Sequence, residues 1–117
     1  MRLLLPFSLE KFGRETFERT APEWWWRFEA LLPRCEVLCQ PDVLGPVPYG
    51  ETAYERNNLW ILENVRSELP RDSTSALLVW DLQQTGDGPG GAADFAARAA
   101  NLVREIVIIN PTEFATR

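Results

Sequence analysis

Histidine is absent from the 117-residue sequence, and cysteine occurs only twice, at Cys35 and Cys39. Two thiols without an imidazole supply too few of the usual ligands for a zinc site, so no metal site is expected. Cys35 and Cys39 are the first and last residues of the apolar stretch CEVLC. On one strand they would lie about 13 Å apart at about 3.3 Å per residue, which is too far for a disulfide. We therefore expect reduced, buried cysteines.

Long apolar runs and excess positive charge are also missing. No run approaches the roughly 18 residues of a membrane span. The opening MRLLLPF is too short for a signal peptide and carries no cleavage site, which predicts a cytoplasmic location. The net charge of −5 and the pI near 4.7 provide no basic surface for phosphate backbones or anionic lipids. Neither nucleic acid nor a membrane is an expected partner.

Apolar runs alternate with amphipathic stretches along the chain, whose length predicts a single domain over residues 1–117. Residues 8–19 are predicted to be a loop with a helical turn, and the proline-rich residues 40–50 a loop. The T-x-x-E pattern at Thr20 predicts a helix start. The expected strands are 2–7, 35–39, 75–81 and 105–109, and the expected helices are 20–32, 51–69 and 91–104.

Strands that alternate with helices favour an α/β fold with parallel pairing through crossover helices. We predict a four-stranded, parallel, Rossmann-like sheet in the flavodoxin-like order 2-1-3-4, flanked by helices. In that order a ligand crevice opens between the first and third strands. Phe7 and Ser8 would lie on one side of it, and residues 81–91 on the other.

The segment TGDGPGGAADF, residues 85–95, combines glycines with the start of a predicted helix. Gly88, Gly90 and Gly91 let backbone N–H groups approach a ligand, and the helix N-terminus favours an anion. Asp87 and Asp94 oppose a bare phosphate, and the spacing matches neither G-x-G-x-x-G nor a Walker motif. Phosphate contact and a plain glycine-rich turn both remain open.

The stretches AYERNNLWILE and LLVWDLQQTGDGPGGAADFAARAANLVREIVIINP resemble a bacterial Rossmann-like module related to the TIR, SLOG and nucleoside 2-deoxyribosyltransferase-like folds. The resemblance implies a regulatory or ligand-sensing module of a bacterial signalling or defence system. Asp94 would occupy the position of the transferase nucleophile. Modules of this kind are usually appended to larger signalling or conflict-system proteins. Ala92 stands where they have a small hydroxyl residue, and Leu82 stands where they have glycine.

Asp94 and Asp81 are the candidate catalytic residues of an alternative function, an N-glycosyl hydrolase or transferase acting on NAD or nucleosides. Asp94 would equally complement a helix dipole, and Asp81 would equally cap the glycine loop. Whether the chain is an enzyme is left open, and the departures from the transferase motif favour a noncatalytic role. No cofactor is expected beyond a nucleotide-derived ligand. The candidate ligand-binding residues are Phe7, Ser8, Arg56, Asn57, Asp87, Gly88, Gly90 and Gly91.

Tyr54, Arg56, Asn57 and Asn58 form a polar cluster in the longest predicted helix, where adjacent asparagines are poor helix formers. They contact a ligand, a partner or only solvent. Residues Trp24–Trp26 cannot all point inward from one helix, since successive positions are about 100° apart. At least one exposed tryptophan is therefore expected, which favours a protein partner or a homo-oligomer through this helix. A noncatalytic interaction scaffold is the third function.

Overall fold

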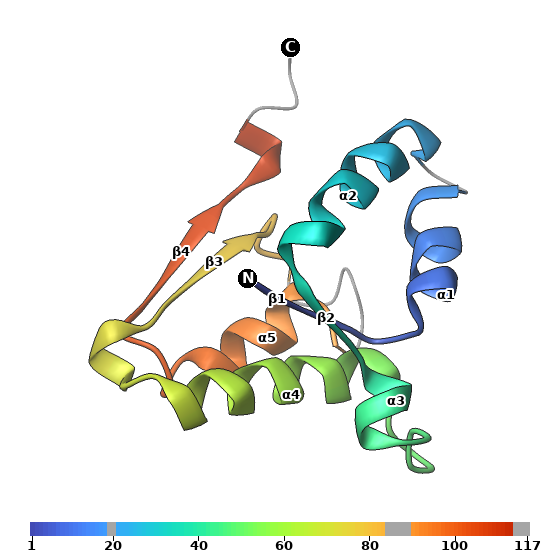
Figure 1. The fold of residues 1–117 in the computed structure, drawn as a ribbon. Coiled ribbons are helices and arrows are strands. Elements are labelled where there is room, and N and C mark those ends of the chain that lie inside the picture. Colours follow the sequence, from blue (N-terminus) through green and yellow to red (C-terminus); the bar gives the residue numbers. More distant parts are fainter. Residues whose placement is uncertain (19–20, 84–89, 114–117) are drawn as a thin grey trace. The chain divides into compact units, whose positions relative to one another are not determined.

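The computed structural model describes residues 1–18, 21–83 and 90–113 (Figure 1). The chain divides into two compact units, an N-terminal unit of residues 1–53 and a C-terminal unit of residues 54–117.

Each unit contains one two-stranded parallel sheet. In the N-terminal unit β1 (Arg2–Leu5) pairs with β2 (Glu36–Cys39), and Arg2 lies opposite Glu36. In the C-terminal unit β3 (Ser75–Val79) pairs with β4 (Glu105–Ile109), and Ser75 lies opposite Glu105. The strands lie close to where the sequence predicts them, and both pairs are parallel.

The prediction of a four-stranded Rossmann-like sheet in the order 2-1-3-4 is wrong. The described strands form two separate sheets, β1-β2 and β3-β4, and β1 does not lie beside β3 in either. The prediction assumed that unbroken apolar strands are covered on both faces. Burial instead alternates along β3, where Leu77 and Val79 are exposed.

The N-terminal unit is more helical than the sequence suggests. Residues predicted as a loop form α1 (Leu9–Gly13) and a π-helix (Arg14–Glu18). The helix predicted over 20–32 is present as α2 (Trp25–Leu31) between two short 3-10 turns, Pro22–Trp24 and Leu32–Arg34. Thr20 lies outside the described residues. The loop predicted over 40–50 begins with a short helix, α3 (Gln40–Leu44).

The helical stretch continues past Gly13 into the π-helix. The absence of a side chain at Gly13 makes room for a packed aromatic ring. A Cβ atom placed there would lie 2.6 Å from the Trp25 ring, so the indole packs directly on the Gly13 backbone. Trp25 in turn packs against Phe17 and Phe28, with ring centroids 5.8 and 5.7 Å away. Phe12 completes this aromatic cluster through its contacts with Phe17 and Phe28.

In the C-terminal unit, α4 (Ala53–Glu68) precedes β3, and α5 (Ala92–Ala99) precedes β4. Helix α5 ends before the predicted residue 104, because the chain turns so that the Arg104 N–H donates to the Thr74 carbonyl at 2.8 Å. No described helix is long and apolar enough to cross a membrane. The core of the unit joins residues of both helices and both strands: Leu62, Ala99 and Val103, with Ala76, Phe95, Leu102 and Ile106 packed against them.

Candidate functional site

The turn before α5 packs directly against the first turn of α4. Gly90 has φ +85°, and a Cβ atom there would collide with Tyr54 and with the backbone of Glu55. Glycine is therefore needed at this position both for its backbone conformation and for close contact with another helix. The backbone of Gly90 approaches α4, which is an alternative to the ligand contact expected from the sequence.

Asn58 of α4 holds this turn in place. Its side-chain Nδ2 donates to the carbonyl oxygens of Gly90 at 2.9 Å and Gly91 at 3.3 Å. The same nitrogen donates to Asp94 Oδ2 at 3.0 Å. An asparagine inside a helix is explained here, since its amide satisfies acceptors on the turn and on the first turn of α5.

The Asp94 carboxylate also accepts from Arg98, one helical turn later. Arg98 Nε lies 3.0 Å from both Asp94 oxygens, and Arg98 Nη2 lies 3.9 Å from Glu55 Oε2. The side chains of Glu55, Arg98, Asp94 and Asn58 thus form a continuous polar chain from α4 to α5, which we call the α4–α5 clasp. With donors already on both of its oxygens, Asp94 is suited to holding the helix start.

Asp81 lies in a separate turn after β3. Its side chain is exposed, and Oδ1 accepts from the Gln83 N–H at 3.0 Å. The indole Nε1–H of Trp80 donates to the Gln83 carbonyl at 3.1 Å, and Leu82 has φ +66°. Asp81 therefore caps a turn through the amide of Gln83, which is the kind of role expected for it, although the sequence suggested glycine amides as the donors.

The other candidate residues belong to different parts of the chain. Ser8 caps α1, since its Oγ accepts from the Lys11 N–H at 3.2 Å, and Lys11 Nζ lies 4.1 Å from the Phe7 ring centroid. The expected crevice required β1 beside β3 in one sheet, and the strands that the structure describes do not pair in this way. On α4, Asn57 is buried and Arg56 is half-buried. Asp87 and Gly88 lie outside the described residues.

The prediction that at least one of the three adjacent tryptophans is exposed is confirmed. Trp25 faces the aromatic cluster, whereas Trp24 is 51 % exposed and Trp26 is 61 % exposed. The Arg27 guanidinium lies 4.4 Å from the Trp24 ring centroid and 5.3 Å from that of Trp26. The Arg27 side chain thus makes cation–π contacts with both exposed rings.

A surface that the sequence did not predict lies on the β3-β4 sheet. Leu77 lies opposite Val107, and Val79 lies opposite Ile109, so the four side chains share one face. They are exposed by 65, 45, 66 and 41 % respectively. The alternate positions Ala76 and Ile106 pack on the core. We call the exposed side the outer sheet face. Burial alternates along β3, whereas in β4 Ile108, on the opposite side of the strand, is also 40 % exposed.

Both cysteines are free and half-buried, and Cys35 Sγ lies 3.8 Å from Met1 Sδ. Burial raises the pKa of the Cys39 thiol above its ordinary value. Within residues 1–18, 21–83 and 90–113, no group of three or more metal-ligating side chains is found.

Comparisons with protein-family models, with curated proteins and with solved structures found no match. The resemblance to a bacterial signalling or defence module therefore remains a prediction that rests on the quoted motifs.

Proposed function

We propose that the chain is a noncatalytic interaction module that associates with a second copy of itself through the outer sheet face. The observation that carries the proposal is the alignment of four exposed aliphatic side chains, Leu77, Val79, Val107 and Ile109, on one side of a two-stranded sheet. Contiguous apolar patches of this kind mark interaction surfaces in soluble proteins.

The chemistry of the face favours a second copy as the occupant. The centre of the face is uncharged, so it has no charge pattern with which to select a different partner, and an aliphatic surface is complementary to itself. Two such sheets pack about 10 Å apart across a twofold axis. At one end of the face, Glu105 Oε1 accepts from Ser75 Oγ at 3.4 Å and from Arg104 at 3.0 Å, forming a polar rim.

The exposed fractions also set the expected affinity. Burying the exposed half of each aliphatic side chain contributes about 1 kcal/mol, or about 8 kcal/mol for both copies. Loss of translational and rotational freedom costs about 4 kcal/mol or more. The remainder of about 4 kcal/mol corresponds to a dissociation constant on the order of 1 mM. The charge of −5 on each copy opposes association, so added salt should strengthen it.

The noncatalytic part of the proposal is supported by the α4–α5 clasp. The candidate nucleophile Asp94 accepts hydrogen bonds from Asn58 and Arg98, and Asp81 serves a separate turn. A carboxylate stabilised in this way is a weaker nucleophile than a free one, because its charge is already shared with donors.

Sedimentation velocity from about 10 µM to about 1 mM tests the proposal. The wild-type chain should show a concentration-dependent monomer–dimer equilibrium that shifts to dimer with salt. Val79→Lys should abolish it, because the dimer would bury an unpaired charge. Val43→Lys, at an exposed valine on α3, is the matched control and should leave it unchanged. A monomer at every concentration, or equal behaviour of the two variants, would refute self-association.

A further inference from the structure

We propose that the N-terminal unit contains a second site, which binds a small zwitterion bearing an aromatic ring, such as an aromatic α-amino acid. The site is a cavity of about 320 Å³ with a mostly apolar lining, formed by Glu10, Gly13, Arg14, Glu18, Pro22 and Trp25. Its volume is at the lower end of the range for small-molecule sites, about 300–1,000 Å³. This inference does not depend on self-association.

The apolar wall of the cavity is fixed in place. The Trp25 ring packs on the Gly13 backbone on one side and contacts Phe17 and Phe28 in the aromatic cluster. An indole held by packing keeps its orientation without a ligand, so ligand binding costs little side-chain entropy. A flat aromatic ring is the group that such a wall accommodates best.

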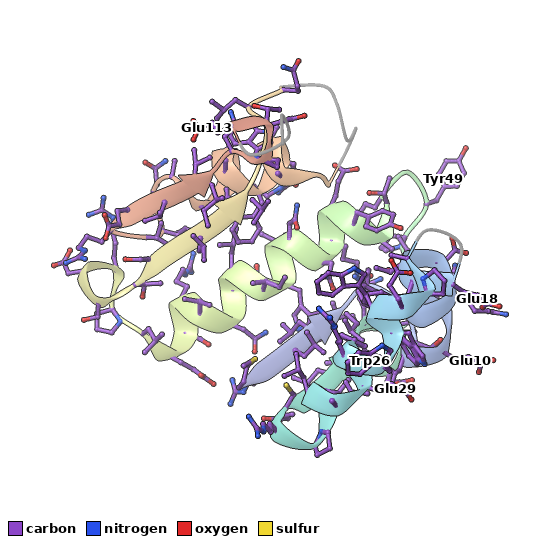
Figure 2. The ribbon with its side chains drawn as sticks, turned by 90° about the horizontal axis from the view of Figure 1, so that it is seen from above. Glu10, Glu18, Trp26, Glu29, Tyr49 and Glu113 are labelled. Atoms are coloured by element: carbon purple, nitrogen blue, oxygen red, sulfur yellow. The ribbon has the colours of Figure 1, made fainter. Side chains whose placement is uncertain are left out.

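The charged residues of the cavity lie in a row along the helical segment. Glu10, Arg14 and Glu18 are spaced four residues apart and are exposed. Figure 2 shows the labelled Glu10 and Glu18 side chains projecting at the same edge of the unit. In the part of the chain that the structure describes, none of these three side chains makes an ion pair or side-chain hydrogen bond.

One guanidinium between two carboxylates is complementary to a ligand that carries both charges. A ligand carboxylate would pair with Arg14, and a ligand ammonium group would pair with Glu10 or Glu18. A ligand with only a positive charge would be repelled by Arg14, and a ligand with only a negative charge would be repelled by Glu10 and Glu18. The aromatic wall and the mixed charges together therefore define the ligand class.

The local backbone gives an independent reason to expect a site here. Residues Arg14–Glu18 form a π-helix, which directly follows α1. π-Helical turns are rare and occur frequently at functional sites. Here the π-helix carries Arg14 and Glu18 into the lining of the cavity.

An NMR titration of the full chain with L-phenylalanine tests the inference. The amide signals of Gly13 and Arg14 and the indole signal of Trp25 should shift together, with a dissociation constant on the order of 1 mM. Three analogues separate the contributions. Phenethylamine lacks the carboxylate, 3-phenylpropanoate lacks the ammonium group and L-alanine lacks the ring, and each should bind more weakly.

Charge-neutral variants assign the contacts. Arg14→Gln should weaken L-phenylalanine binding about two- to fivefold, as expected for exposed ion pairs, and should not weaken phenethylamine binding. The Glu10→Gln/Glu18→Gln double variant should weaken both ligands. Glu15→Gln, at an exposed position of the same π-helix that does not line the cavity, is the control. Unshifted Gly13 and Trp25 signals at about 20 mM ligand, or variants indistinguishable from the control, would overturn the assignment.

Discussion

Replacing Asn58 by alanine would remove the donor that links α4 to the start of α5. Its amide makes one bond to the charged Asp94 oxygen and a second, shared interaction with the carbonyls of Gly90 and Gly91. The bond to the carboxylate contributes about 1.5–3 kcal/mol and the bond to the carbonyls about 1 kcal/mol. Alanine favours the helix by about 0.5 kcal/mol relative to asparagine. The free energy of unfolding should therefore fall by about 2–3.5 kcal/mol.

Urea denaturation followed by far-UV circular dichroism measures this loss, which corresponds to a decrease in Tm of about 10 °C for a small domain. Asn64→Ala is the control on the same helix, since the one acceptor of Asn64 Nδ2 among the described residues is the Trp60 carbonyl one turn earlier, at 3.1 Å. That variant should change stability by less than about 1 kcal/mol. Equal losses in the two variants would show that the link from α4 to the turn stabilises the fold no more than a bond within the helix, and the structural role assigned to Asp94 would lose its support.

Three further predictions concern other parts of the molecule. Gly90→Ala should destabilise the C-terminal unit by more than about 2 kcal/mol in the same urea assay, because the alanine would combine a positive φ with a collision against α4. An unchanged urea midpoint would contradict the packing of this turn. Burial raises the folded-state pKa of Cys39 above its unfolded value, so the free energy of unfolding should fall as the pH rises past about 9. The Cys39→Ala variant should lack this fall, and the Cys35→Ala variant should retain it. Incubation with NAD or nucleosides should release no free base by chromatography; a release that Asp94→Asn abolishes would instead establish the N-glycosyl enzyme and overturn the noncatalytic proposal.

Local signals predicted the positions of the strands and the main helices well. The run EIVII coincides with β4, and the apolar spacing after Gly91 identified residues that reach the core. Leu102 and Val103 pack there even though α5 has already ended at Ala99. Periodicity reports which side chains face a core, and it does so whether or not the backbone remains helical.

The lateral arrangement of the strands could not be predicted in the same way. SALLV is apolar at consecutive positions, which suits a strand covered on both sides, but the sequence does not say whether the second cover comes from the same chain. Leu77 and Val79 were therefore assigned to a buried sheet and are exposed. The outer sheet face is the feature that this reasoning missed.

The candidate site shows the same limit. Residues 8–19 were predicted to be mainly loop, although Gly13 within them packs against the Trp25 ring twelve positions later. Asn58 was recognised as unusual for a helix, but its acceptors, Gly90 and Asp94, are 32 and 36 residues away. Such contacts depend on tertiary packing, which single-residue preferences do not encode.

Parallel pairing within each unit has a consequence for the order of folding. The strands that meet in β1-β2 are 34 residues apart in the chain, and those in β3-β4 are 30 residues apart. A parallel pair cannot be closed by a tight turn, so each ladder must wait until the intervening helices have shortened the distance between its strands. We expect helical signals to develop first on refolding and the protection of strand amides to follow, separately in the two halves of the chain.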